Sequence, residues 1–317
     1  MRDGYRVNSE SNTLLPGDLV RVLSVEEILS TLDEQGTLDH LPFMPEMIQF
    51  AGRTFRVSRQ AFKTCVDDQE MRQLERTVLL DKVRCDGSSH GGCGKACLIF
   101  WKEDWLRRVS PATSSFESSE SRKNGNASPK LDRATLTSLA ISEDQFFCQS
   151  SEIINASKPL PWWHVRQYFW DLKYNQIPFL QWLKSLFIAC YNKVAYVGRF
   201  PSWNFIAGPG ETIVAEQPLN LLPGELVRVK SLKQIRATLD SLGKNQNLLF
   251  APSMAEFCGC VLRVEGRVDN IVLEGSRRQR KIKDTVLLEG ATCDGICHRM
   301  CPRQSFLFWR ECWLERI

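Results

Sequence analysis

The segment LLPGDLVRV (residues 14–22) returns as LLPGELVRV at residues 221–229, an offset of 207. The match continues in the same order through three further pairs: TVLL (77–80 and 285–288), Cys-Asp-Gly (85–87 and 293–295), and FWKEDWLRRV (100–109) with FWRECWLERI (308–317). So many ordered matches do not arise by chance. The chain therefore carries two copies of one unit, and this duplication decides the fold to expect.

Local signals predict a small β-rich module in each copy. Ser24, three residues before Glu27, forms a capping box for a short helix through about Asp33. The second copy keeps the box as Ser231 and Gln234. The remaining apolar runs are short, alternate with polar residues and are separated by turn residues, which is typical of a small barrel or a half-open sheet.

Short apolar motifs link each repeat to known small barrels. The PGDLVRV segment (16–22) and a closing Trp-containing strand resemble those of SH3-like barrels. The whole chain also resembles a bacterial cysteine-rich tandem-repeat family, through LPFMPEM (41–47), the Cys-Asp-Gly segment and FWKEDWL (100–106). These resemblances imply a mainly β fold of two tandem SH3-like small barrels with a helical insertion. They imply no particular activity.

Composition divides the chain into four parts. The boundaries expected are a first repeat at 14–109, a Ser-rich polar linker at 110–133, a helical aromatic segment at 134–215 and a second repeat at 216–317. The linker has no apolar periodicity, and its composition is typical of disorder. Each repeat is expected to carry its own Cys/His loop.

The aromatic segment predicts two helices within residues 159–196. Pro161 and Pro178 each stand where a helix would start. In the second helix an apolar line recurs at helical spacing: Phe179, Leu183, Leu186, Cys190 and Val194. We expect these helices to pack on the barrels or on a second copy of the chain. A contact lying in the plane of a membrane surface, or a dock for another protein, are the alternatives.

Bulk properties exclude several classes of protein. The 317 residues carry a net charge of +4, which is too small to indicate a nucleic-acid partner by itself. No apolar stretch is long enough for a transmembrane helix, and the first residues have no signal-peptide pattern. We therefore expect a cytoplasmic protein. In that reducing compartment, its 12 cysteines are metal ligands or reactive thiols more often than disulfides.

The cysteines cluster at matching places in the two copies, with Cys-x4-His-x2-Cys retained in both. The first copy supplies Cys65, Cys85, Cys93 and Cys97, with His90 in reserve. The second copy supplies Cys293, Cys297, His298 and Cys301, and a hairpin cysteine could also contribute. Donors three to eight residues apart in one loop can surround one ion at about 2.0–2.3 Å. We expect one metal site in each repeat.

The leading interpretation of each cluster is structural zinc, because such an ion stabilises a long loop on a small barrel. An iron–sulfur cluster is the first alternative, favoured by the four thiols of the first copy. Core cysteines without metal, or thiols that form disulfides, are the second.

Three functions follow from these interpretations. The leading one is a zinc-binding tandem-barrel protein acting as an accessory or interaction module. The second is a metallo- or iron–sulfur enzyme of small-molecule biosynthesis, for which Cys97 and Cys65 are candidate catalytic thiols. The third is a nucleic-acid-binding adaptor that uses the basic run RRQRKIK (277–283), although such a run is more often a solvated face.

Overall fold

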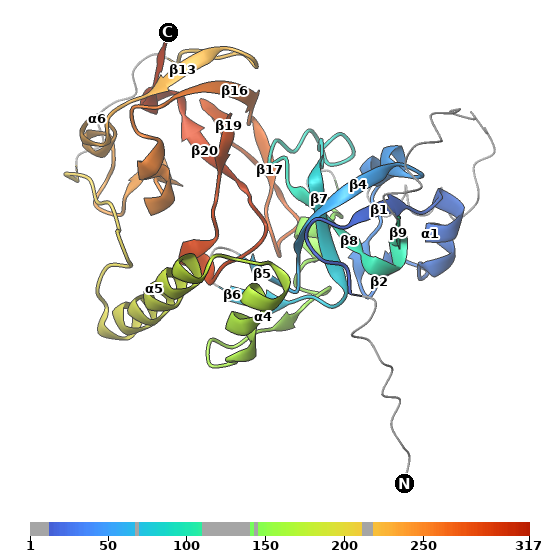
Figure 1. The fold of residues 1–317 in the computed structure, drawn as a ribbon. Helices are drawn as coiled ribbons and strands as arrows, with labels where there is room; N and C mark the ends of the chain where they lie inside the picture. The colour runs from blue at the N-terminus through green and yellow to red at the C-terminus, as the bar shows by residue number, and fades with distance from the viewer. Residues whose placement is uncertain (1–12, 67–69, 110–139, 143–144, 211–217) are drawn as a thin grey trace.

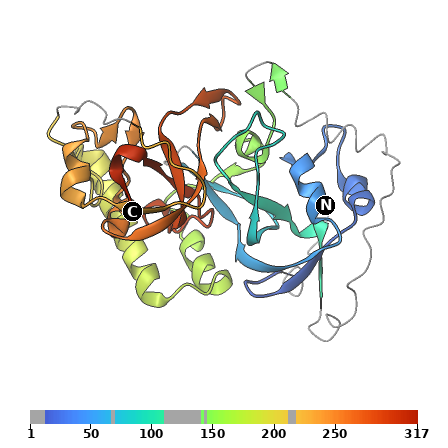
Figure 2. The same cartoon turned by 90° about the horizontal axis from the view of Figure 1, so that it is seen from above.

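Two curled antiparallel sheets dominate the computed structural model, which describes residues 13–66, 70–109, 140–142, 145–210 and 218–317. The linker expected at 110–133 lies outside these residues. Figures 1 and 2 show the two repeats side by side, the first in blue to teal and the second in orange to red. The expectation of a mainly β chain with two barrel-like sheets and a few helices is confirmed.

The first sheet has five strands in the order β8-β7-β4-β1-β9. These are β1 (Leu19–Val22), β4 (Thr54–Gln60), β7 (Thr77–Arg84), β8 (Leu98–Lys102) and β9 (Leu106–Arg108). Between them lie α1 (Val25–Thr31), the small hairpin of β2 (Thr37–Leu38) and β3 (Leu41–Pro42), and the 3₁₀ helices η1 (Pro45–Phe50) and η2 (Glu103–Trp105). The Ser24 capping box that starts α1 is confirmed.

The second sheet repeats this order as β20-β19-β16-β13-β21. Its strands are β13 (Leu226–Val229), β16 (Val261–Arg267), β19 (Thr285–Thr292), β20 (Phe306–Arg310) and β21 (Leu314–Arg316). The intervening elements are α6 (Leu232–Ala237), β14 (Lys244–Asn245), β15 (Leu248–Leu249), η4 (Pro252–Phe257), η5 (Ile296–His298) and η6 (Glu311–Trp313). The predicted capping box of Ser231 and Gln234 is present at α6.

Strand register also agrees between the two sheets. Equivalent residues pair in each: Leu19↔Arg56 with Leu226↔Arg263, and Thr77↔Lys102 with Thr285↔Arg310. The cores agree as well, because the buried indoles of Trp105 and Trp313 donate to threonine hydroxyls at 3.1 and 3.0 Å. Each indole also packs edge-on against a phenylalanine. The same pattern of apolar residues thus makes the same core twice.

Each repeat also extends a hairpin beyond its sheet. In the first repeat β5 (Lys63–Val66) and β6 (Glu70–Gln73) form a sheet with β12 (Lys158–Pro159). In the second, β17 (Asn270–Val272) pairs with β18 (Gln279–Lys281). The basic run 277–283 spans β18, and Arg277 forms a 2.7 Å ion pair with Glu152. The charge of Arg277 is therefore already paired with an acidic residue of the same chain.

The segment between the repeats joins the first core. β10 (Ala140–Ser142) pairs with β11 (Gln145–Phe146), and α3 (Gln149–Glu152) follows. The Gln149 side chain accepts from the backbone N–H of Phe100 at 2.8 Å and donates to its carbonyl at 2.9 Å. It therefore pairs with β8 much as a neighbouring strand would. This contact brings Cys148 and Ile153 into the first hydrophobic core.

The two predicted helices are α4 (Arg166–Tyr174) and α5 (Phe179–Gly198). Helix α5 begins directly after Pro178 as expected, whereas α4 begins five residues after Pro161. A buried ion pair of 2.6 Å between Lys63 and Asp171 fixes α4 to the β5–β6 hairpin. In Figure 1 both helices lie below the sheets.

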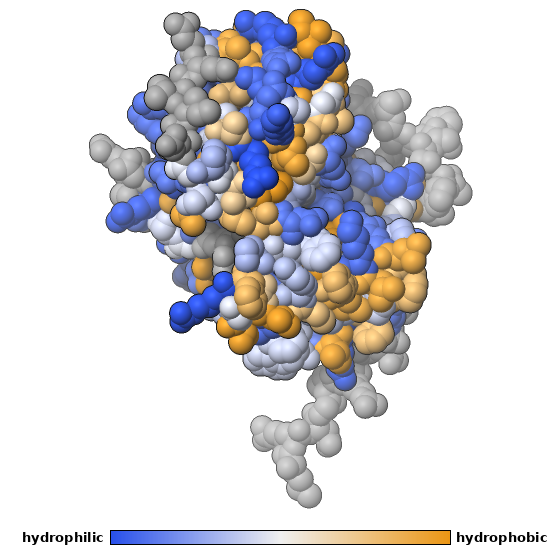
Figure 3. Space-filling view, turned by 90° about the vertical axis from the view of Figure 1, so that its left-hand side faces the viewer, coloured by the Kyte–Doolittle hydropathy of each residue, from blue (hydrophilic) through white to orange (hydrophobic). Residues whose placement is uncertain are grey.

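The apolar line predicted on α5 does not face the barrels. Phe179, Leu183 and Val194 are exposed, and the buried residues of the helix are Ser185, Ile188 and Ala195. Figure 3 shows orange side chains over the lower part of the face on which α5 lies. Self-association through this line stays a prediction. Among the described helices, none has the length and apolar character needed to cross a membrane.

Candidate metal centre

The loop of residues 85–97, here the first loop, joins β7 to β8 and folds back on itself. The backbone N–H groups of His90 and Gly92 both donate to the Gly87 carbonyl, at 3.0 and 3.1 Å. Gly87 has a φ of +71°, and a Cβ placed there would lie 2.1 Å from the Cys93 carbonyl oxygen. Only glycine allows so tight a turn. The turn directs His90 inward.

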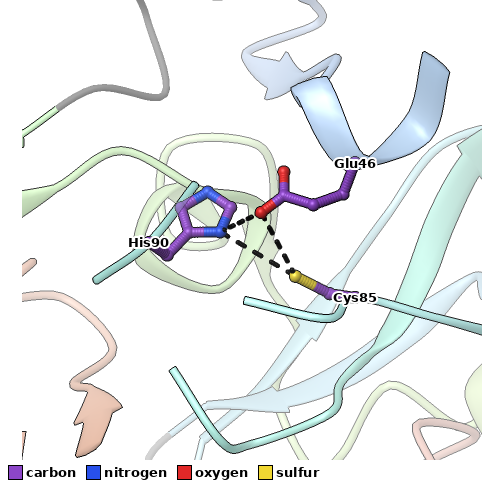
Figure 4. A group of neighbouring side chains, drawn as sticks. All are labelled: Glu46, Cys85 and His90. Carbon is purple, nitrogen blue, oxygen red and sulfur yellow. Dashed lines mark hydrogen bonds and ion pairs between the residues drawn. The ribbon is translucent and has the colours of Figure 1, made fainter. Parts of the chain in front are cut away.

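Three donor atoms meet under this loop (Figure 4). Glu46 comes from η1, Cys85 follows β7 directly, and His90 lies at the turn. His90 Nδ1 is 2.8 Å from Glu46 Oε1 and 3.8 Å from Cys85 Sγ. Cys85 Sγ lies 3.9 Å from the same carboxylate oxygen. We call these three side chains the triad. Carboxylate, imidazole and thiolate are all zinc ligands.

The triad is largely buried, and two of its polar atoms lack a hydrogen-bond partner among the described residues. The side chains of Glu46 and His90 are 0% and 2% exposed. Burial alone would raise the pKa of Glu46, but the hydrogen bond and charge of His90 outweigh it and hold that pKa below its ordinary value. Glu46 Oε2 and His90 Nε2 are buried without a hydrogen-bond partner among the described residues. Such orphaned atoms are costly unless something else satisfies them.

More thiols surround the triad. A small cavity beside it is lined by Cys85, Cys93, Cys97 and Cys148, with His90; we call it the thiol cavity. Burial raises the pKa of the Cys85 and Cys93 thiols, and the neighbouring Cys97 raises both further. Burial likewise raises the pKa of Cys148 to about 11. Without a cation, the thiols of Cys85, Cys93 and Cys148 are neutral at pH 7. A divalent metal would supply the missing positive charge.

The loop of residues 293–305, the second loop, has the same backbone as the first. His298 and Met300 donate to the Gly295 carbonyl at 2.9 and 2.8 Å, and Gly295 has a φ of +75°. Its cysteines are dispersed, however. Cys293 packs against the second core, whereas Cys301 lies in a separate cluster with Met71.

Of the remaining predicted ligands of the second loop, His298 belongs to no described group of metal-ligand residues. His298 is half-buried within η5, and the side chain of Cys297 lies outside the described part of the chain. Among the residues that the structure describes, the triad is the one group of three such donors close enough to hold a metal ion. A site on the second loop therefore stays a prediction.

Cys65 is the predicted ligand that the structure places elsewhere. It lies on β5, and its Sγ is 3.2 Å from the Cys301 Sγ of the second loop. It is not among the residues that line the thiol cavity. The other expected residues of the first copy, Cys85, His90, Cys93 and Cys97, do border this one cavity.

Sequence reasoning missed two members of the site, Glu46 and Cys148. Glu46 is the acidic residue of the LPFMPEM segment, and Ser253 stands at its position in the second copy. A buried acid inside an apolar segment, retained in one copy only, is the signal that could have found it. Cys148 lies outside both repeats, so no internal comparison could identify it.

Comparison with known proteins adds no family or relative. No protein-family model, no curated protein and no solved structure matches the chain. The resemblances to SH3-like barrels and to a cysteine-rich tandem-repeat family therefore stay expectations. The conclusion that the described residues support is coarser: a tandem β protein with a buried Glu/Cys/His group able to hold a metal ion.

Proposed function

We propose that the chain is a zinc-binding protein whose first repeat holds the ion between Glu46, Cys85 and His90. The observation that carries this proposal is the convergence of three different donor atoms, one from η1 and two from the first loop, within 4 Å of one another in a buried site. A mixed set of oxygen, nitrogen and sulfur donors suits zinc better than an iron–sulfur cluster, which prefers thiolates.

The spacing of the triad supports tetrahedral zinc. Ordinary zinc bond lengths and tetrahedral angles place a sulfur ligand about 3.6 Å from a nitrogen or oxygen ligand, and nitrogen and oxygen ligands about 3.4 Å apart. The two distances from Cys85 Sγ, 3.8 and 3.9 Å, are close to the first value. The 2.8 Å contact of His90 with Glu46 is shorter, because there the two atoms share a hydrogen bond. Coordination would replace that hydrogen bond and widen the contact.

The fourth ligand would come from the thiol cavity. Cys93 and Cys97 line it and lie on the same loop as His90. Four protein ligands make a closed site, which is the structural type. Zinc would then fix the first loop on the first core. This role suits an accessory or interaction module, because the ion stabilises a surface instead of presenting an open coordination position.

Metal analysis of the full chain, purified without added metal, tests the proposal. We expect the triad to hold one zinc ion, which is lost in three variants: Cys85→Ser, His90→Ala and Glu46→Ser. The last substitution introduces the residue that the second copy carries at that position. The matched controls are Cys293→Ser and His298→Ala in the second loop, which should keep the zinc.

Two results would contradict the proposal. One is a metal-free chain that binds no added zinc, which would leave the triad as a buried Glu46–His90 ion pair beside a neutral thiol. The other is equal loss of zinc in the first-loop variants and in their second-loop controls. Circular dichroism of each variant shows whether the fold is retained, so that ligand loss is separated from unfolding.

An iron–sulfur enzyme is the second candidate, favoured by one observation. Four thiols, those of Cys85, Cys93, Cys97 and Cys148, border the same cavity, and four thiolates are the usual ligands of such a cluster. A brown protein that loses its colour in Cys148→Ser would favour this candidate. A colourless protein with zinc, unaffected by the same variant, would favour the first proposal.

A further inference from the structure

The cysteine loop of each repeat contacts the hairpin of the other repeat. The Val272 backbone N–H on β17 donates to Cys93 Sγ at 3.4 Å. The Cys65 backbone N–H on β5 donates to Cys301 Sγ at 3.2 Å. Cys65 and Val272 are equivalent positions of the two copies, as are Cys93 and Cys301. The same contact is therefore made twice, with the partners reversed.

The two contacts differ in one side chain. Where the first loop meets Val272, the second loop meets Cys65, and the Sγ atoms of Cys65 and Cys301 are 3.2 Å apart. A disulfide bond needs about 2.05 Å between sulfur atoms. The sulfurs already lie in contact, so the approach required is small. Cys301 is 3% exposed, and Cys65 is half-buried, which gives the pair one edge toward solvent.

Charge around the pair favours a thiolate. The Arg303 guanidinium donates to the Cys65 carbonyl at 3.0 Å and forms a 2.7 Å ion pair with Glu274. Burial alone would raise the pKa of Cys301, but the hydrogen bond with Cys65 and the charge of Arg303 outweigh it and lower that pKa to about 6. A thiolate is the reactive form of cysteine. In the first loop, by contrast, the pKa values of the Cys85 and Cys93 thiols are raised.

We propose that Cys65 and Cys301 form a disulfide bond between the two repeats when the chain meets hydrogen peroxide. The Cys301 thiolate attacks one peroxide oxygen, the O–O bond breaks, and the hydroxide released takes up a proton to become water. The resulting sulfenic acid is attacked by the Cys65 sulfur. The S–S bond forms, the S–O bond breaks, and a second water leaves with the Cys65 proton. Two thiols are oxidised, and one peroxide is reduced to two waters.

The bond would join residues 236 positions apart. It would fasten β5 of the first repeat to the second loop. A dithiol such as dithiothreitol would reverse it by exchange. This inference does not depend on zinc, because Cys65 and Cys301 do not line the thiol cavity.

Peptide mapping of the reduced full chain tests the proposal. Trypsin cuts after lysine and arginine, so Cys65 falls in the peptide 64–72 and Cys301 in the peptide 300–303, each with one cysteine. The chain is treated with substoichiometric hydrogen peroxide, blocked with N-ethylmaleimide and digested without reductant. We expect the linked pair of these peptides to form at least about tenfold faster than any oxidation product of the exposed Cys190 or Cys260.

The matched control is Cys65→Val, which places in the first repeat the residue that the second repeat already uses. This variant should fold and keep its zinc, and it should lose the linked peptides. Two results would overturn the proposal: oxidation of Cys190 or Cys260 without the linked pair, or loss of zinc in Cys65→Val, which would make Cys65 a ligand. The link in the unchanged chain, together with zinc retained and the link lost in Cys65→Val, supports it.

Discussion

The first and second loops share a backbone and differ in what lies against them. Both fold around a glycine of positive φ whose carbonyl accepts the same pair of hydrogen bonds. Under the first loop a carboxylate from η1 reaches the histidine, whereas Ser253 stands at that position in the second copy. Under the second loop a thiol from the other repeat reaches Cys301. The two loops thus share a backbone hydrogen-bond pattern but are offered different donors: a carboxylate reaches the first loop, and a thiol reaches the second.

The surroundings also set the charge of the cysteines in the two loops. Cys93 is half-buried near other thiols, and burial raises its pKa. Its equivalent, Cys301, is more deeply buried, but the hydrogen bond with Cys65 and the charge of Arg303 outweigh burial and lower its pKa. The Cys93 thiol of the first loop would therefore lose its proton to a bound metal. The Cys301 thiol of the second loop is deprotonated more easily without one.

The largest expected loss of stability concerns the β5–β6 hairpin, which contacts the second loop. Asp171→Asn leaves the buried Lys63 ammonium without its carboxylate partner, which should lower the free energy of unfolding by about 3–5 kcal/mol. Asn270 is the equivalent of Lys63 in the other hairpin, and Asn270→Ala should cost below about 1 kcal/mol. Urea unfolding of both variants measures the difference. An equal loss of unfolding free energy in both variants would show that the Lys63–Asp171 ion pair adds no special stability to the first hairpin.

Alanine at the two loop glycines should be nearly as costly. Gly87→Ala and Gly295→Ala would place a Cβ 2.1 and 2.2 Å from a carbonyl oxygen, at a backbone conformation that L side chains rarely adopt. We expect each to lower the free energy of unfolding by about 2–4 kcal/mol. Only Gly87→Ala should also lose zinc, as measured by metal analysis of the folded fraction. Zinc loss in Gly295→Ala alone would reverse the assignment of the site.

Zinc affinity should rise with pH. The pKa values of the Cys85 and Cys93 thiols are raised, so zinc must displace protons, and each released proton should increase affinity about tenfold per pH unit. Competition with a zinc chelator between pH 6 and about 8 measures this slope. Cys301, with a pKa of about 6, should be largely thiolate above pH 7. A flat profile for zinc would mean that the buried thiols are not ligands.

Val272→Cys should have the smallest effect on stability, because the two side chains are of similar size; we expect a cost below about 1.5 kcal/mol. It would give the first loop the thiol partner that the second loop has. Peroxide should then link residues 93 and 272, more slowly than residues 65 and 301, because the pKa of Cys93 is raised. The same peptide mapping detects it. Absence of that link at every pH would show that the two contacts are not equivalent.

Much of the fold could be predicted because its signals are local. The repeated strands, both capping boxes and the start of α5 after Pro178 follow from short segments. The grouping of Cys85, His90 and Cys93 could be predicted too, because one loop carries them all.

The unpredicted features are long-range. Glu46 reaches the site from η1, and Cys148 is brought there by the pairing of Gln149 with Phe100. Cys65 is predicted as a ligand of the first loop that a neighbouring strand supplies. The exchange between repeats, which nothing in the local pattern reveals, places it against Cys301 instead.

The reciprocal placement of loop and hairpin has a consequence for how such a chain could arise. A solitary unit could satisfy the same contact only by pairing with an identical molecule about a twofold axis. In that symmetric dimer every substitution occurs on both sides at once. Joining two units in tandem removes this constraint, so position 65 can hold a thiol while position 272 holds valine. In a tandem chain, two equivalent surfaces can therefore carry different side chains, as positions 65 and 272 do.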